Sequence, residues 1–220
     1  MKYSGRIVII SVVVILILAI RTYGSLYYNY PSLQFPLIGV ILVFASWLLG
    51  TQYDKLKFLS ERDVLTNLYN RRFLLYTFPK LIASVDRKQE KLIVYFIDVD
   101  DFKIINDTRG HEIGDRVLQR IANVLTLHSQ KRDIVVRWAG DEFLILSPLS
   151  DDRNKAKTIS LIQNELKLSS QELDIAISVS IGTATYPNEA QTLDDLLHAA
   201  DQGMYILKSD NKNQLKFISN

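Results

Sequence analysis

The chain reads FIDVDDFK at residues 96–103 and RWAGDEF at residues 137–143, and these two stretches decide its fold. Each joins apolar, β-branched or aromatic residues, typical of a buried strand, to a cluster of acids. If the two strands pair, Asp98 lies beside Asp141 and Glu142. Carboxylates crowded in this way repel one another unless a cation neutralises them, and Mg²⁺ favours one or two carboxylates plus substrate phosphates. Asp98 taken alone is more typical of an acid that marks the turn at a strand end, but together the two stretches predict a metal-dependent phosphate site.

The composition of the 220 residues narrows the chemistry. Cysteine is absent, which excludes disulfides, thiolate metal sites and thiol catalysis. With only three histidines, a His-rich metal site is not expected, so the metal should be a hard, oxygen-liganded cation, Mg²⁺ or alternatively Mn²⁺. The formal net charge of +2 gives no general argument for a nucleic-acid partner, and we expect none.

Apolar residues concentrate near the N-terminus. Residues 7–20 are apolar except for Ser11, and residues 33–50 carry no charge. We predict two transmembrane helices, at about residues 6–24 and 33–50, which make residues 1–50 a membrane anchor. A cleaved signal peptide or buried core helices are the alternatives. Against the signal peptide, the first run has no obvious small-residue cleavage site, and a second apolar stretch follows at once.

Basic residues indicate how this anchor is oriented. Two of them precede the first predicted span and three follow the second: Lys2, Arg6, Lys55, Lys57 and Arg62. The positive-inside rule then places the N-terminus and the part of the chain after the second span in the cytoplasm. The protein is therefore expected to be a multi-pass protein of the cell membrane. The external loop, about Gly24–Ser32, is too short for a sensory domain.

The remainder divides into a polar connector, residues 51–62, and a soluble domain, residues 63–220. The connector is predicted to be helical and able to pair with a second copy, or else a solvated linker. In the domain we predict helices over residues 70–85, 114–128, 156–168 and 193–208, and strands over 92–98, 134–138, 143–146, 175–186 and 214–218. This order is α+β and ferredoxin-like in outline, with a central, mostly antiparallel sheet flanked by helices. The polymerase palm shares that outline, so fold alone does not give function.

Four residues near the acidic stretches suit a nucleotide. Gly140 lets the backbone approach a phosphate closely, and Lys103 can neutralise a triphosphate. Asn106 and Asp115 flank a predicted loop at residues 108–111, and their side chains have the hydrogen-bonding groups to read a guanine. The alternative is that both are Asx-turn or helix-capping residues.

Residues 63–220 resemble the GGDEF domain of the diguanylate cyclase family. Six ordered segments carry the resemblance: DVLTNLYNRR at 63–72, DVDDFKIIND at 98–107, GHEIGD at 110–115, RWAGDEF at 137–143, SVSIGTA at 178–184 and the helix that contains residues 200–208. The resemblance implies a palm-type fold and the condensation of two GTP into cyclic di-GMP, with release of pyrophosphate. Because each domain would bind one GTP, it also implies a homodimer.

The same resemblance implies the roles of individual residues. Asp98, Asp141 and Glu142, with the carbonyl of Val99, match the metal-binding positions. Asp141 also matches the base that activates the ribose 3′-hydroxyl, with Glu142 beside it, and Lys103 would stabilise the transition state. Asn106 and Asp115 match the residues that read guanine. The other substrate contacts implied are Phe102, Lys103, Lys208 and Lys212.

Three departures from the family pattern bear on activity. Ala139 replaces the first Gly of the signature, and Lys212 stands where Arg is frequent, so that a point charge replaces a bidentate fork. The family's inhibitory product site, Arg-x-x-Asp, ends four residues before Arg137. Here that window begins with Gln130 and ends with Asp133, so we expect feedback inhibition to be weak or lost. The alternative function is a catalytically degenerate GGDEF domain that binds GTP or a partner protein.

Overall fold

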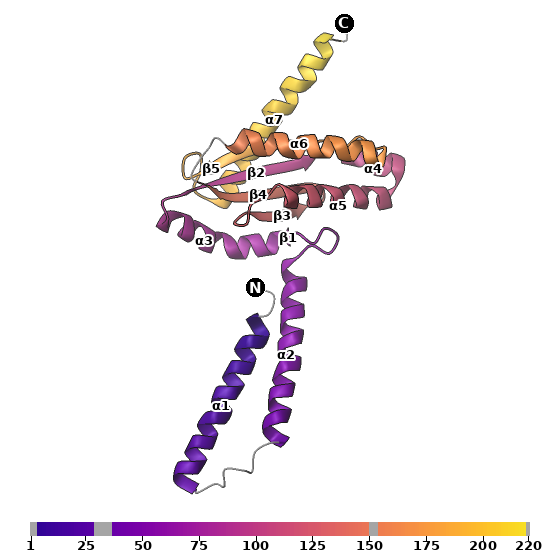
Figure 1. Cartoon of the computed structure of the whole chain (residues 1–220). Coiled ribbons are helices and arrows are strands. Elements are labelled where there is room, and N and C mark those ends of the chain that lie inside the picture. Colours follow the sequence, from indigo (N-terminus) through magenta and orange to yellow (C-terminus); the bar gives the residue numbers. More distant parts are fainter. Residues whose placement is uncertain (1–3, 29–36, 150–153, 219–220) are drawn as a thin grey trace. The chain divides into compact units, whose positions relative to one another are not determined.

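The computed structural model describes residues 4–28, 37–149 and 154–218, and within the last helix it describes side chains as far as Tyr205. The chain divides into two compact units, Met1–Glu61 and Arg62–Asn220. The first unit contains α1 (Ser4–Tyr28) and α2 (Leu37–Glu61), which lie side by side (Figure 1). Because α2 continues without a break to Glu61, residues 51–61 of the predicted connector are helical, whereas Arg62 forms an isolated β-bridge with Tyr69.

Apolar side chains dominate the surface of α1. Ile15 and Ile20 are 64% and 71% exposed, and an exposed apolar surface of this kind is typical of a contact with a membrane or with another protein. Among the described residues, one segment, Ile7–Tyr27, is long and apolar enough to cross a membrane, with a mean hydropathy of 2.5. The second predicted span is not confirmed, and its first residues, 33–36, lie outside the described part of the chain.

The described part of the second unit forms one five-stranded sheet in the order β1-β3-β4-β2-β5. The strands are β1 (Tyr69–Asn70), β2 (Lys91–Val99), β3 (Ile134–Ala139), β4 (Glu142–Leu149) and β5 (Val179–Tyr186). The pair β1–β3 is parallel and the other three pairs are antiparallel. The helices are α3 (Arg71–Arg87), α4 (Phe102–Arg109), α5 (His111–Leu127), α6 (Asn154–Leu173) and α7 (Leu193–Ile218). The predicted mostly antiparallel sheet flanked by helices is confirmed.

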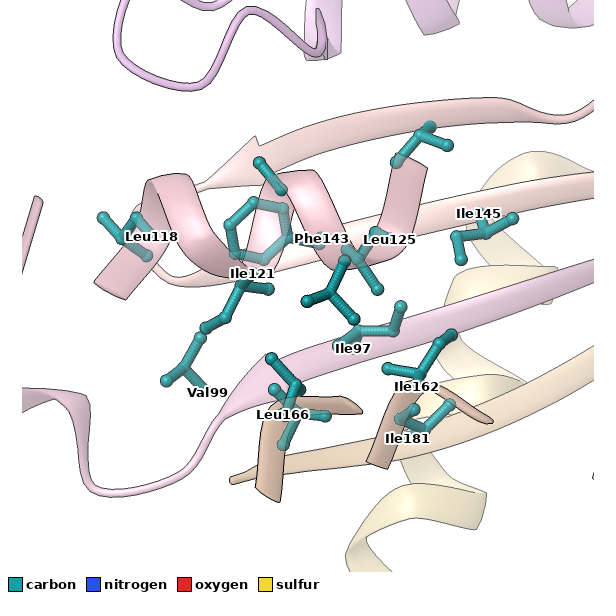
Figure 2. Packing of buried hydrophobic residues seen from close by; sticks show 14 of the residues in the cluster. Ile97, Val99, Leu118, Ile121, Leu125, Phe143, Ile145, Ile162, Leu166 and Ile181 are labelled. Carbon is teal, nitrogen blue, oxygen red and sulfur yellow. The ribbon is translucent and has the colours of Figure 1, made fainter. Parts of the chain in front are cut away.

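Side-chain alternation along β2 divides the core into two layers, because successive residues of a strand point to opposite faces of the sheet. Ile93, Tyr95 and Ile97 pack with α5 and α6, whereas Leu92, Val94 and Phe96 pack with α3 and α7. Figure 2 shows the first layer, in which Ile97 of β2 and Phe143 of β4 lie close to Ile121 of α5. Six consecutive residues of β2, 92–97, are buried, as the continuous apolar run predicts.

The strand predicted from residue 175 begins only at Val179, and the helix predicted to end at residue 168 ends at Leu173. Two further local predictions differ from the structure. Residues 214–218, predicted as a last strand, lie in α7, which runs to Ile218. Their alternating pattern is only five residues long, and no Gly or Pro separates them from the preceding helix, so the helix continues. Residues 108–111, predicted as a loop, hold the end of α4 at Arg109 and the start of α5 at His111, and Gly110 alone joins the two helices. Its φ of +84° suits glycine and ends α4.

A close contact fixes α7 on the sheet. A Cβ added to Gly182 of β5 would lie 1.9 Å from the carbonyl oxygen of Ala200 and 2.9 Å from the Cβ of Met204, both in α7. Neither group can rotate away, since one is backbone and the other is a Cβ. The bare backbone of Gly182 therefore sets how closely α7 approaches β5.

We expect Gly182→Ala to lower the free energy of unfolding by about 1 to 3 kcal/mol, the usual cost of overpacking. The control is Gly203→Ala, because a Cβ at Gly203 in α7 meets no atom within 4 Å. Alanine is the better helix former, so the control should match or exceed the wild type in stability. Denaturant titration of the full chain in detergent measures both, and equal stabilities would contradict the packing argument.

Candidate functional site

The two acidic stretches meet at one end of the sheet. In the antiparallel pair β2–β4, Asp98 lies directly opposite Glu142, and on its other side Asp98 lies opposite Ser180 of β5. The backbone N–H of Val99 donates to the carbonyl oxygen of Asp141 at 3.3 Å. Ile97 and Phe143 point toward α5, so Asp98 and Glu142, each one residue away, point to the α3–α7 face. The prediction that the acids lie together is confirmed by this register.

The environment of Glu142 is unfavourable to its own charge. Burial, followed by the negative charges of Asp98, Asp141 and Asp201, raises the pKa of Glu142, and the guanidinium of Arg71 only partly opposes this. Asp201 comes from α7 and Arg71 begins α3, so both helices of that face contribute to the site. Asp201 lies within the sixth segment of the resemblance, but no role was predicted for it.

This end of the sheet therefore offers a few carboxylate oxygens that could bind a hard cation. Among the described residues, no group of three or more His, Cys, Asp or Glu side chains is arranged to hold a metal by itself. An incomplete protein set is what Mg²⁺ uses when substrate phosphates supply the remaining ligands. A cation beside Glu142 would neutralise its acidic neighbours and so offset the part of the raised pKa that comes from their charges.

The turn that carries Asp141 is anchored by one arginine. Arg137 donates from Nε and Nη2 to the carbonyl oxygen of Gly140, at 2.9 and 2.7 Å, and from Nη1 to Oδ1 of Asp63 at 3.0 Å. Thr66 donates to the same Asp63 oxygen from its backbone N–H at 2.9 Å and from its hydroxyl at 2.7 Å. The 63–72 segment of the resemblance thus holds the acidic turn, a role that its sequence did not reveal.

Asp100 has a similar anchoring role on the other side of the site. Its carboxylate accepts hydrogen bonds from the hydroxyls of Ser178 and Ser180 at 2.8 and 2.6 Å, and its N–H donates to the carbonyl of Ser178 at 3.0 Å. These bonds fasten the turn between β2 and α4, where Asp101 has a left-handed φ of +55°. Sequence reasoning missed these contacts, because Ser178 and Ser180 lie 78 and 80 positions after Asp100 in the chain.

The predicted substrate residues lie on the two helices that follow β2. Phe102 is partly buried and Lys103 is exposed in the first turn of α4, while Asn106 lies further along the same helix. Asp115 is exposed in α5. The N-cap of α5 is Gly110, so neither Asn106 nor Asp115 caps a helix, and the capping alternative is wrong. The side chains of Lys208 and Lys212 lie outside the described residues, although both positions belong to α7.

The window of the predicted product site is occupied by contacts within the chain. Asp133 accepts from the N–H of Gln130 at 2.8 Å and from the hydroxyl of Ser147 at 2.7 Å. Arg132 makes two hydrogen bonds, at 2.8 and 2.5 Å, to the carboxylate of Glu90. Arg132 is thus paired with an acid of the same chain, and its hydrogen bond is the main cause of the lowered pKa of Glu90.

Fold and site together define a palm-like α+β domain with a cluster of acids at one end of its sheet. The family model "Diguanylate cyclase, GGDEF domain" matches residues 60–214. The chain belongs to this GGDEF family, as the six segments predicted. It is 38% identical over 159 residues to the diguanylate cyclase DosC of Escherichia coli strain K12, a match that covers 70% of this chain and 34% of DosC. The chain thus spans about a third of the length of the curated relatives it matches.

Solved structures agree with the fold. The GGDEF domain of PA1120 (TpbB or YfiN) from Pseudomonas aeruginosa PAO1 is 37% identical, with a TM-score of 0.61 over 68% of this chain and 89% of that one. The coiled coil and GGDEF domain of DgcB from Caulobacter crescentus, solved in complex with c-di-GMP, is 26% identical. Its TM-score is 0.67 over 74% of this chain and 88% of that one.

The hydrogen bonds that Asp63 accepts from Thr66 and Arg137 make the stability of the fold depend on pH. Burial opposes ionisation of Asp63, but the hydrogen bonds from Thr66 and Arg137 outweigh it and lower its pKa below 3.8. Its contribution to stability is therefore complete above the unfolded pKa and is lost as the pH falls through the lower, folded pKa. We expect Asp63→Asn to cost about 2 kcal/mol at pH 7 and much less near pH 2.

Thermal unfolding of the full chain, followed at several pH values, measures this difference. The control is Asp194→Asn, which removes an exposed carboxylate in the first turn of α7. A stability difference between wild type and Asp63→Asn that is the same at pH 7 and pH 2 would contradict the anchor.

Proposed function

We propose that this chain is a diguanylate cyclase that condenses two GTP into cyclic di-GMP with release of two pyrophosphates. The observation that carries the proposal is the register of Asp98 opposite Glu142, because it gathers the acids of both stretches at one end of the sheet. Membership of the GGDEF family and the diguanylate cyclase name of DosC agree with it.

Each chemical step is an in-line displacement at an α-phosphorus. The ribose 3′-oxygen of one GTP forms a bond to the α-phosphorus of the other, and the bond from that phosphorus to the bridging oxygen of pyrophosphate breaks. Asp141 accepts the proton of the 3′-hydroxyl, and Lys103 offsets the charge that develops on the phosphate. Asn106 and Asp115 hold the guanine, while Phe102, Lys208 and Lys212 complete the substrate contacts. Since one domain holds one GTP, two chains must meet for both bonds to form.

The metal that we propose for this site is Mg²⁺, with Mn²⁺ as a possible substitute. Asp98, Asp141, Glu142 and the carbonyl of Val99 would hold it, and GTP phosphates would complete its ligands. When bound, it would neutralise phosphate charge and polarise the reacting phosphoryl group. The acidic neighbours that raise the pKa of Glu142 support this assignment.

We expect the full chain in detergent, given GTP and Mg²⁺, to form cyclic di-GMP that chromatography resolves. Asp141→Ala should lower the rate at least a hundredfold, roughly the loss caused by removing one essential catalytic group. Chelation of the metal should abolish turnover, and added Mg²⁺ should restore it. The matched control is Asp194→Ala, which removes a carboxylate in the first turn of α7 and should keep full activity.

The alternative function is a GTP-binding module without catalysis. It is suggested by Ala139 and Lys212, which depart from the family pattern. Ala139 is exposed, next to a register shift in the β3–β4 pair, where a methyl group meets little resistance. If wild-type chain binds GTP but forms no product at any protein concentration, the cyclase proposal fails and the receptor function stands. A rate per chain that rises with protein concentration would support the homodimer.

We further propose that residues 1–50 anchor the chain by two membrane spans, 6–24 and 33–50, with the linker 51–62 and the GGDEF domain, 63–220, in the cytoplasm. The exposed apolar surface of α1 supports the first span. The basic residues that flank the spans support the orientation.

Since the chain has no cysteine, single-cysteine variants report this topology directly. A membrane-impermeant maleimide should label Ser25→Cys in intact cells, because Ser25 belongs to the expected external loop. Ser4→Cys and Lys57→Cys should be labelled only after permeabilisation. Labelling of Ser4→Cys in intact cells would reverse the orientation, and release of the chain by carbonate would exclude the anchor.

Product inhibition is proposed to be weak. Gln130 replaces the arginine of the inhibitory site, Arg132 is paired with Glu90, and both oxygens of Asp133 accept hydrogen bonds from the chain itself. Submicromolar cyclic di-GMP should therefore leave turnover unchanged. Gln130→Arg restores the Arg-x-x-Asp spacing and should lower the inhibitory concentration. Strong inhibition of the wild type in the same titration would contradict the proposal.

A further inference from the structure

Gly114, in the first part of α5, is a buried glycine pressed against α4. A Cβ added to it would lie 1.9 Å from Oδ1 of Asn106, 3.0 Å from Cγ of the same residue and 3.3 Å from Cζ of Phe102. The first distance is far shorter than any van der Waals contact. The amide of Asn106 and the tip of the Phe102 ring therefore occupy the volume that any side chain at this position would need. Both residues belong to α4, which packs against α5 (Figure 1).

Local backbone structure does not explain a glycine here. Gly114 lies inside a helix, outside the left-handed region, whereas the nearby Gly110 has a φ of +84°. Within a helix, glycine is less favourable than alanine. The remaining explanation for glycine at this position is that it has no side chain. The amide of Asn106 occupies the space that a side chain would take.

The position of that amide matters because Asp115 is the next residue along α5. Asn106 and Asp115 belong to different helices, and Gly114 is the point at which the amide of one rests on the backbone that carries the other. We infer that Gly114 is a positioning residue that sets base specificity, by holding the Asn106 amide in register with the Asp115 carboxylate. This inference rests on the proposed function, in which these two side chains read guanine.

Two side chains that read one base act together only if their spacing matches the base. A carboxylate accepts from N1–H and the 2-amino group, and an amide can donate or accept beside it. A site built from such groups discriminates strongly, because the wrong base leaves buried polar groups unpaired. Displacement of the amide by a methyl group at residue 114 should thus weaken guanine binding while leaving the phosphate contacts intact.

The test measures binding of 3′-deoxy-GTP and 3′-deoxy-ATP, with Mg²⁺, to the full chain in detergent. Both lack the 3′-hydroxyl and cannot be condensed, so binding is separated from turnover. For Gly114→Ala we expect the affinity for 3′-deoxy-GTP to fall about tenfold, the loss of roughly one hydrogen bond to a polar site. The affinity for 3′-deoxy-ATP should change little, so the preference for guanine falls.

A double-mutant cycle with Asn106→Ala identifies the mechanism. If residue 114 acts through the amide, Gly114→Ala should cost no further affinity in the Asn106→Ala chain. Additive losses would overturn the inference. Gly203→Ala, a helical glycine with open space around it, is the control for a general glycine-to-alanine effect and should leave both affinities unchanged.

Stability separates this role from simple packing. The colliding atom is the far end of a flexible side chain, so Gly114→Ala should melt within a few degrees of the wild type. If Gly114→Ala unfolds and Gly114→Ala/Asn106→Ala folds, Gly114 serves packing and the specificity role is wrong. If the wild type prefers guanine and Gly114→Ala keeps that preference, the inference alone fails. If the wild type binds neither nucleotide, the proposed function fails with it.

Discussion

The antiparallel pairing of β2 with β4 is the constraint on which the rest of the structure depends. It joins residues 44 to 58 positions apart in sequence, from Asp98 with Glu142 to Lys91 with Leu149, and brings both acidic stretches to the same end of the sheet. Its register is held by burial on both faces, since Ile97 and Phe96 enter different core layers. A slip by one residue would exchange those layers and turn Asp98 away from the α3–α7 face. Core packing therefore positions the acids at the site.

Gathering these acids lowers stability, and the surrounding contacts offset that loss. Burial and three acidic neighbours disfavour the charge of Glu142 and raise its pKa. Arg137 fastens the turn on one side, through Asp63 and Gly140, and Asp100 fastens the other through two serines. Rigid anchors of this kind hold the neighbouring carboxylates in place despite their repulsion.

Some of this was accessible from sequence, and the errors have identifiable causes. The long, strongly apolar strand 92–98 and the amphipathic helix 114–128 were predicted nearly to their ends, because their periodicity is strong. The short α4 was missed since eight residues give little periodic signal. Residues 214–218 were assigned to a strand on an alternation too short to distinguish from a helix. The capping role weighed for Asn106 failed because Gly110 is the N-cap of α5.

By itself, the sequence indicated which residues we propose to carry the chemistry. The acids and Lys103 were predicted from residue type and spacing, the roles of Asn106 and Asp115 followed from the family resemblance, and the order of the six segments specified the family. Only the tertiary structure decided which groups support them. The contacts of Arg137 with Asp63, of Asp100 with Ser178, and of Asn106 with Gly114 follow from register and helix packing. The local sequence around each of these residues does not indicate its partner, because the distance between the two is fixed only when the core is packed.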